Sequence, residues 1–483
     1  MNVKFIPIRL IAGLLFLIVS ASCSDSRNNN LVLESEADLS GLTLSTSAGN
    51  YYEHKYSKRP DVNVFAAATQ ADALQAVRQG LADVFVGDDI ELPERTRKRL
   101  GVKVAFYGED AFEVAYCVKK GNTELLEQFN KFLASIPLQD IIDHWTKDGP
   151  QVPDPNAGRP IENTEPLRCV VCNNLEPVSY VGEGGKWMGL DPDLLGRFAN
   201  YIGRPIEIKL QDLGGAITSI QAGQVDFIGG NIFVTDERKT FMDFTDPYYI
   251  CHPSYVVVDH DSRAHIGMGD RIRMNLIREN RWKLITDGFA ETIKITVLAI
   301  LIGTILGMGV CAALRSRRRW IRSTAGLYGS FIQGTPTLVL LLIMFYVVFA
   351  SSGMSASLVA IITFAFSFAS SAGNIFNSSI STVPVGQTEA GLSLGFTPYK
   401  TFTGIVLPQA LRRGLPLYAG ECVKLLQSTS IVGYIAIQDL TRASDLIRSR
   451  TFDALIPLLI ITIIYFVLAW LIRKLLNLLL IRK

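Results

Sequence analysis

Short apolar runs alternate with amphipathic stretches along the first half of the chain. From residue 38 to about 160, runs such as VNVFAA, ADVFVGD and VKVAFYG have the length and residue types of strands, whereas TQADALQAVRQGL and NTELLEQFNKFLASI repeat apolar residues at helical spacing. The same alternation returns from about 167 to 260, where RCVVC, PIEIKL and VDFIGG surround DPDLLGRFANYIG. Alternating strands and helices predict an α/β fold with mostly parallel sheets, in two lobes over residues 38–157 and 158–262. The Pro- and Gly-rich stretch Gly149–Pro160 is the predicted linker.

The pattern changes after residue 262. Residues 263–287 are amphipathic and basic, and the rest of the chain, 288–483, contains long apolar runs. A helix needs about 20 apolar residues to cross a bilayer. The runs that approach this length are Ile293–Ala313, Gly326–Ala350, Leu358–Ser378, Leu415–Ile437 and Ile456–Leu471. Residues 288–483 are therefore predicted to form an all-α transmembrane domain of about five helices.

The first residues have the pattern of an export signal. Two basic residues precede an apolar run, Leu10–Ala21, which is short for a membrane span and ends in small residues. Residues 1–22 are predicted to be a signal peptide and residues 23–37 a polar tether. The stretch VSASC resembles a lipobox, which implies lipidation of Cys23. An ordinary cleaved signal and an uncleaved anchor are the alternatives, and in each case the two lobes are exported.

Exported lobes fix the predicted orientation of the membrane domain. The first span then runs inward, and the arginine-rich loop Arg315–Ser323 lies in the cytoplasm, as the positive-inside tendency expects. The basic segment 263–287 falls outside, predicted to lie flat on the membrane surface, and so do Arg442, Arg448 and Arg450, against that tendency. These features predict a multi-pass protein of the bacterial inner membrane with its binding domain on the periplasmic or extracellular side.

Composition and motifs argue against nucleic-acid partners and against enzymatic activity in this chain. Hydrophobic residues make up 48% of the chain and the formal net charge is +2, which favours a mixed soluble and membrane protein and no nucleic-acid partner. The sequence has no G-x4-G-K-[ST] loop and its histidines are scattered, so we expect this chain neither to hydrolyse ATP nor to be an enzyme. Cys169 and Cys172 have metal-site spacing, but residues three apart on a strand point to opposite faces. We therefore expect structural cysteines and no metal or other cofactor; a disulfide among the exported cysteines is permitted by the compartment.

A polar stretch, Gly386–Ala410, stands between the third and fourth apolar runs. Within the segment 381–408 it resembles the coupling loop of ABC importer permeases, with every spacing kept and a glycine in place of the motif's third alanine. The matching residues are Glu389, Ala390, Gly391, Gly395, Ile405, Leu407 and Pro408. The resemblance covers nearly all of residues 288–483 and is to the polar amino-acid permeases. It implies a helix–glycine–helix projection that engages separate cytoplasmic ATPase subunits, and a homodimeric membrane core. A simple connector is the alternative.

Three polar residues fall on one face of the fourth apolar run. Glu421, Lys424 and Gln427 have helical spacing, and ionisable groups inside a membrane are candidates for a functional role. They are therefore candidate pore residues, and a mutual Glu421–Lys424 pair that holds the bundle together is the alternative. Gln333, Asn374 and Asn377 stand where this permease family usually has charged residues.

The stretch GNIFVTDERKTFMDFTDPYY, Gly230–Tyr249, resembles the signature of the family 3 extracellular amino-acid-binding proteins. This resemblance implies a two-lobed periplasmic-binding-protein-like fold in which Arg238 binds the substrate carboxylate through two parallel hydrogen bonds. A surface ion pair with Asp243 is the alternative. The resemblance also implies that Asp88 holds the α-ammonium group and that Gly49 and Asn50 at a helix start attract the carboxylate. The other candidate ligand-binding positions are Asn231, Phe233, Cys172, Leu175 and Leu213, of which the last three stand where the family usually has an acid and two aromatic rings.

The two lobes occur in an unusual order. Residues 38–157 look like the second half of that binding-protein family and residues 158–262 like the first half. One circularly permuted binding protein is the simpler interpretation, and two truncated copies are the alternative. Together the resemblances predict the substrate-binding and permease subunit of an ATP-driven importer for amino acids or close analogues. A ligand-gated channel, a membrane-bound solute sensor, or a degenerate site that binds nothing are the alternatives.

Overall fold

The computed structural model describes residues 31–147, 165–172, 174, 176–182, 185–259, 267–350 and 352–481. The predicted signal peptide, Cys23, the linker Gly149–Pro160 and the candidate ligand residue Leu175 lie outside the described residues. The chain divides into two compact units. The first contains residues up to Asp89 together with Arg95–Asp110 and His252–Ala264, and the second contains Ile90–Glu94, Ala111–Cys251 and everything from His265 onward.

The first unit is built on a mixed five-stranded sheet. Its order is β2 (Asn63–Ala67), β1 (Thr43–Ser47), β3 (Val84–Asp88), β14 (Pro253–Val258) and β4 (Val102–Tyr107). Strand β1 runs parallel to β2 and β3, whereas β14 is antiparallel to β3 and β4. Every residue of β3 is buried, as expected for a central strand covered on both faces. The helices of this unit are η1 (Glu36–Leu39), α2 (Tyr51–Tyr56), α3 (Gln70–Arg78) and most of α4 (Glu94–Leu100).

A second five-stranded sheet forms the α/β lobe of the second unit. Its order is β10 (Ile206–Leu210), β7 (Leu167–Val171), β11 (Phe227–Gly229), β6 (Cys117–Lys119) and β12 (Met242–Phe244). The first three strands are parallel and the last two antiparallel to their neighbours. Two short ribbons accompany it, β5 (Phe112–Val114) with β13 (Tyr249–Cys251), and β8 (Tyr180–Val181) with β9 (Trp187–Met188). Its helices are α5 (Thr123–Ser135), α6 (Leu138–Thr146), α7 (Leu190–Tyr201), α8 (Leu213–Gln221) and α9 (Asp236–Lys239).

Each of the two sheets contains a strand from the other half of the binding region, and the sequence patterns did not predict this pairing. Strand β6 precedes the predicted boundary at residue 157 but pairs with β11 and β12 of the second sheet, whereas β14 follows that boundary and pairs with β3 and β4 of the first. The division into residues 38–157 and 158–262 therefore does not coincide with the structural division, and neither sheet is purely parallel. Local patterns identify strands, but the pairing partner depends on contacts that are distant in the sequence.

Long helices make up the membrane part of the second unit. Three described helices are long and apolar enough to cross a membrane: α11 (Trp282–Leu314), α14 (Ala356–Ser381) and α19 (Leu455–Ile481). A fourth candidate is α12 (Arg319–Gly334) followed by α13 (Thr337–Ile343) and the π-helical η6 (Met344–Val348), which are bent by 105°. Pro336 lies at this break, where it can donate no helical hydrogen bond. The fourth predicted run lies instead in α17 (Leu407–Ser428) and the 3-10 helix η8 (Thr429–Ile435), so the predicted five spans are not confirmed.

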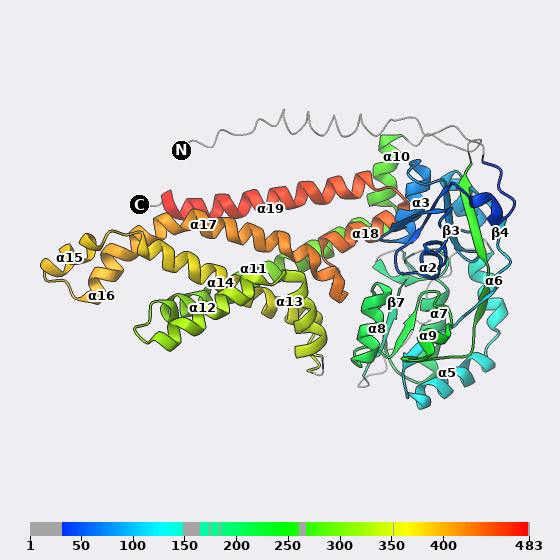
Figure 1. The fold of residues 1–483 in the computed structure, drawn as a ribbon, viewed down its shortest axis with the longest axis horizontal. Helices are drawn as coiled ribbons and strands as arrows, with labels where there is room; N and C mark the ends of the chain where they lie inside the picture. The colour runs from blue at the N-terminus through cyan, green and yellow to red at the C-terminus, as the bar shows by residue number, and fades with distance from the viewer. Residues whose placement is uncertain are drawn as a thin grey trace. The chain divides into compact units, whose positions relative to one another are not determined.

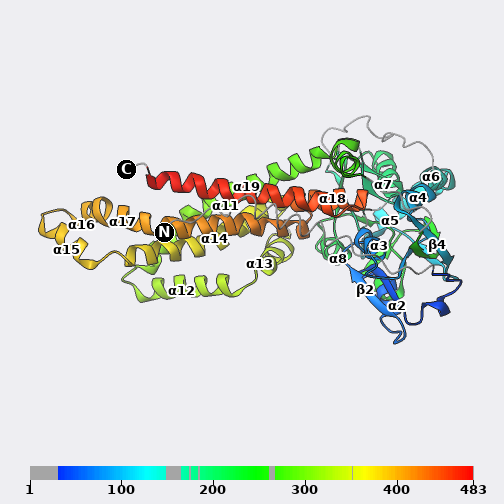
Figure 2. The same ribbon diagram turned by 90° about the horizontal axis from the view of Figure 1, so that it is seen from above.

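Glycine and alanine residues allow the central helices to approach closely. In Figures 1 and 2, α11, α14, α17 and α19 run side by side. A Cβ on Gly303 of α11 would lie 2.8 Å from the carbonyl oxygen of Ala365, and one on Gly373 of α14 would lie 2.6 Å from a methyl group of Val310. Small residues at such crossings are typical of membrane helix pairs. The crossing holds α11 against α14 with little room for larger side chains.

The basic segment before α11 is not simply flat and exposed. It forms α10 (Met268–Ile272), the π-helical η4 (Arg273–Ile277) and the 3-10 helix η5 (Arg278–Asn280), with Asn275 fully buried. Two of its arginines form ion pairs with acidic residues: Arg271 pairs with Asp453, and Arg281 pairs with Glu279 at 2.8 Å. The helix α18 (Leu440–Thr451) packs against this segment. The charges that oppose the positive-inside tendency are therefore partly neutralised within the fold.

Candidate functional site

Candidate ligand residues of the second unit lie where its parallel strands end. Cys172 follows β7, Leu213 follows β10 and Asn231 follows β11. Because β10, β7 and β11 are parallel neighbours, these residues share one edge of the sheet, where α/β proteins commonly bind ligands. Leu213 and Cys172 pack on one apolar cluster of the lobe. We name this edge, with its three residues and Arg238, the ligand edge.

Arg238 is placed by the short helix α9. Thr235 caps this helix by accepting from the backbone N–H of Arg238, and the Arg238 Nη1 donates to the carbonyl oxygen of Phe233 at 3.0 Å. Burial lowers the pKa of Arg238 from its usual value. Within the described part of the chain no carboxylate forms an ion pair with it. The alternative partner, Asp243, instead pairs with Lys120 at 2.6 Å and accepts from Gly121 N at 2.8 Å. A half-buried guanidinium with spare donors is suited to a carboxylate ligand.

The other residues around Arg238 are apolar or strained. Phe233 is 5% exposed and stacks on Phe112, with ring centroids 4.7 Å apart. Its ring therefore forms part of the apolar wall beside Arg238. Asn231 has a positive φ of 63°, which directs the chain sharply after β11. The ligand edge is therefore lined mainly by apolar side chains, and Arg238 supplies its cationic group.

A buried aspartate that the sequence analysis missed supports this edge. Asp191, in the first turn of α7, is fully buried and accepts hydrogen bonds from Tyr116 Oη at 2.7 Å, Tyr248 Oη at 2.8 Å and Gly230 N at 2.5 Å. Burial raises the pKa of Asp191, although these hydrogen bonds favour its ionised form. It thereby joins α7 to the turn that carries Asn231. The signal available in the sequence was an acidic residue at the buried start of the helix in DPDLLGRF.

We expect Asp191→Ala to destabilise the lobe and to impair ligand binding. The change leaves two buried tyrosine hydroxyls and a backbone N–H without their acceptor, which costs about 1–3 kcal/mol for each unsatisfied group. Thermal unfolding of the full chain should show a clear fall in Tm. The control is Asp140→Ala, which removes an exposed aspartate from the first turn of α6. An equal Tm for the two variants would contradict the supporting role of Asp191.

The first unit holds the remaining candidate ligand residues. Asn50 caps α2, its Oδ1 accepting from Glu53 N at 2.8 Å, and Gly49, with φ of 76°, donates its N–H to Glu53 Oε2 at 2.5 Å. Asp88 is 4% exposed and accepts from Tyr52 Oη at 2.5 Å. The N–H expected to receive a ligand carboxylate therefore already binds the carboxylate of Glu53.

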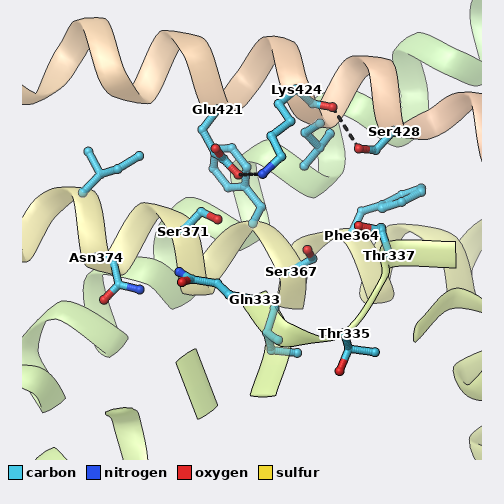
Figure 3. Close-up of a pocket in the computed structure, with 14 residues that line it drawn as sticks. Gln333, Thr335, Thr337, Phe364, Ser367, Ser371, Asn374, Glu421, Lys424 and Ser428 are labelled. Atoms are coloured by element: carbon cyan, nitrogen blue, oxygen red, sulfur yellow. Dashed lines mark hydrogen bonds and ion pairs between the residues drawn. The ribbon is translucent and has the colours of Figure 1, made fainter. Parts of the chain in front are cut away.

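A polar pocket of about 450 Å³ lies among the membrane helices (Figure 3). Glu421 and Lys424 of α17 face it and form the ion pair offered as their alternative role, with Oε1 and Nζ 3.7 Å apart. Gln427, the third candidate, is exposed and is not among its lining residues. Polar side chains complete the lining from the facing helices, and these are Gln333, Thr335, Thr337, Ser367, Ser371 and Asn374. Both charges thus point into a space that is large enough for a small polar solute.

The coupling-loop residues form a projection at one end of the bundle (Figure 1). Helix α15 (Val385–Ser393) carries Glu389, Ala390 and Gly391; the chain then turns at Gly395, with φ of 84°, into α16 (Pro398–Thr401) and the π-helical η7 (Phe402–Val406). Ile405 lies in η7, and Leu407 and Pro408 begin α17.

Packing within this projection explains the glycine that departs from the motif. A Cβ on Gly391 would lie 2.7 Å from Thr401 Cγ2 and 2.9 Å from Ile405 Cδ1. Glycine at this position therefore lets α15 close onto the following helices. Leu394 and Tyr399 are each 77% exposed and Val385 is 72% exposed. The projection combines a compact base with an apolar tip, a combination typical of a docking surface.

Residues 167–426, more than half of the chain, match the model of the bacterial extracellular solute-binding proteins, family 3. The L-cystine transport system permease protein TcyB of Bacillus subtilis (strain 168) is 32% identical over 194 residues, which are 40% of this chain and 83% of that protein. The putative glutamine transport system permease protein GlnP of Rickettsia typhi is 27% identical over 190 residues, 39% and 87% of the two chains. A solved amino acid ABC transporter with histidines is 30% identical, with a TM-score of 0.40, and covers 46% of this chain and 100% of its own.

Proposed function

Since the chain belongs to the bacterial extracellular solute-binding proteins, family 3, and is fused to an amino-acid ABC transporter permease, we propose that it captures an amino acid or close analogue and imports it. It is a multi-pass inner-membrane protein, and its permease relatives imply association with ATPase subunits. The observation that carries the proposal is Arg238, a half-buried guanidinium with no acidic partner among the described residues, at the ligand edge of a chain that also holds a membrane pocket.

The proposed cycle assigns a task to each part. On the periplasmic or extracellular side, the α/β lobe of the second unit holds the ligand, with Arg238 binding its carboxylate. In the membrane, the pocket at Glu421 and Lys424 receives the solute, since an amino acid carries the two complementary charges. On the cytoplasmic side, the projection around Gly395 contacts separate ATPase subunits, which supply the energy, and two copies of the chain form the pore. Strand exchange between the lobes supports one permuted binding protein rather than two truncated copies.

The exposed projection favours an importer over a channel or a sensor. Leu394 and Tyr399 stand away from the bundle with most of their surface accessible. A ligand-gated channel needs no such docking surface for an ATPase. A rigid projection can pass the movement of an ATPase to α14 and α17, the helices on either side of it.

We expect Lys424→Met to reduce ATP-dependent uptake of amino acids at least about tenfold, because a lost charge contact of about 1.5–3 kcal/mol corresponds to that change. Uptake of labelled amino acids is measured in cells that express the chain with its ATPase subunit. The matched control is Lys294→Met, since Lys294 also pairs with a glutamate three residues away, Glu291, but does not line the pocket. Failure of the unmodified chain to import any amino acid would refute the proposed function, and equal uptake by the two variants would refute the pore assignment.

A further inference from the structure

The α/β lobe of the second unit meets the membrane helices in a shared hydrophobic cluster. Val181 of β8 is 5% exposed and belongs to the same cluster as Leu284 of α11, which is 3% exposed. The cluster also takes Leu440, Ala443, Leu446 and Ile447 from α18 and Ile461 from α19, with Trp187 and Leu210 of the lobe packed against it. Interfaces that resemble a domain core cut in half are typical of permanent rather than transient association.

A buried arginine lies at the centre of this contact. Arg450, at the end of α18, is 6% exposed and forms ion pairs with Glu176 of the lobe and, at 3.1 Å, with Glu279 of η5. Its guanidinium also lies 4.3 Å from the ring centroid of Tyr180. Removing one partner of a buried ion pair leaves an uncompensated charge, which is strongly unfavourable. An interface that separated in every transport cycle would break the buried pair between Arg450 and Glu176 each time, whereas Arg450 would keep Glu279.

The lobe contacts the membrane helices through the loops of its ligand edge. Asn174, two residues after Cys172, donates to Ser449 Oγ of α18. The loop around Leu213 is contacted on both sides: Arg442 Nη2 donates to Leu210 O at 3.2 Å and Tyr346 Oη to Gly215 O at 3.5 Å. The residues predicted to line the ligand site therefore stand next to residues that touch α18 and η6.

We propose that this lobe is a permanent part of the membrane domain, held by Arg450, and does not dock and release as a tethered receptor. The inference deepens the proposed function and rests on it: a captured solute is passed to the pore without release of the lobe.

A covalent lock tests this directly. Asn174→Cys with Ser449→Cys replaces two side chains that now form a hydrogen bond by thiols, so oxidation should join lobe to helix with or without amino acid present. A protease site inserted between Asp259 and Gly267 allows the link to be read, because under denaturing, non-reducing conditions the cut halves stay together only when the disulfide has formed. Locked protein should import at a rate within about twofold of the reduced form. Loss of uptake that returns on reduction, or no disulfide at all, would overturn the proposal; the two single-cysteine variants are controls.

Retention of the cut lobe fragment on the membrane fragment is a second test of the permanent contact, and it needs no ligand. With no added cysteines, the cut lobes should remain bound to the membrane fragment in about 1 M salt, since buried pairs are poorly screened. Arg450→Met should lower the retained fraction at least about tenfold. The control is Lys147→Met, which removes an exposed ion pair from the lobe. Separation of the unmodified halves at physiological salt would refute permanent seating, whereas absent import with retained halves would refute the proposed cargo alone.

Discussion

Arg238→Ala is expected to weaken amino-acid binding by about 100-fold or more. Two charge-assisted hydrogen bonds to a carboxylate contribute about 1.5–3 kcal/mol each, and every 1.4 kcal/mol is about a factor of ten. The side chain is already desolvated, since burial lowers the pKa of Arg238, so little further cost is incurred when a ligand carboxylate arrives. Calorimetric titration of the full chain in a lipid nanodisc with each common amino acid provides the measurement.

The neighbouring cation supplies the control for that experiment. Lys239 lies next to Arg238 in α9, is more than half exposed and pairs with Asp236 on the surface at 3.5 Å. Lys239→Ala changes the net charge of the lobe by the same amount, but it should leave the affinity within about twofold. Equal losses in the two variants would show that Arg238 acts only through the general field of the lobe. Absence of heat with every amino acid, from a folded chain, would exclude the amino-acid assignment.

Gly391→Val is expected to lower ATP-dependent uptake at least about tenfold while ligand binding is retained. The valine Cβ would lie within 3 Å of side-chain atoms of Thr401 and Ile405, so α15 has to move away from η7. Overpacking of this kind costs about 1–3 kcal/mol and alters the shape of the projection that the ATPase is proposed to contact. Uptake, and co-purification of the chain with its ATPase subunit, are compared with calorimetric binding of the ligand.

Gly386, a second glycine of α15, provides the matched control for Gly391→Val. A Cβ on Gly386 meets nothing within 4 Å, so Gly386→Val adds the same side chain to the same helix without a clash. Uptake by this variant should stay close to that of the unmodified chain. If Gly386→Val and Gly391→Val are equally impaired, the effect comes from helix propensity or surface change, and the packing explanation is wrong.

Local patterns predicted the kinds of element but not their partners. The apolar runs identified α11, α14 and α19, since length and hydropathy are local properties, and the motif spacing located the turn at Gly395. The assignment of β6 and β14 to the opposite sheets was missed because strand pairing depends on residues more than 100 positions apart, as in the hydrogen bond from Tyr116 N to Thr245 Oγ1.

At the candidate site, too, the sequence indicated residues but not the contacts that their side chains form. Residue type and resemblance indicated Arg238, and the structure adds that Asp243 is engaged by Lys120. They could not reveal that Gly49 N–H binds Glu53, because that contact depends on how the side chain folds back over the helix start. Asp191 escaped notice for a related reason: its three donors come from separate segments of the chain.

The ion pair between Glu176 and Arg450 also constrains the order of events during synthesis. The two residues are 274 positions apart, so at about 5–20 residues per second the ribosome delivers the arginine roughly 15–55 s after the glutamate. Glu176 therefore lacks this partner until the last helices of the chain have been synthesised. The contact between the lobe and α18 through this pair can form only in the last stage of translation, so this part of the fold is completed late in synthesis.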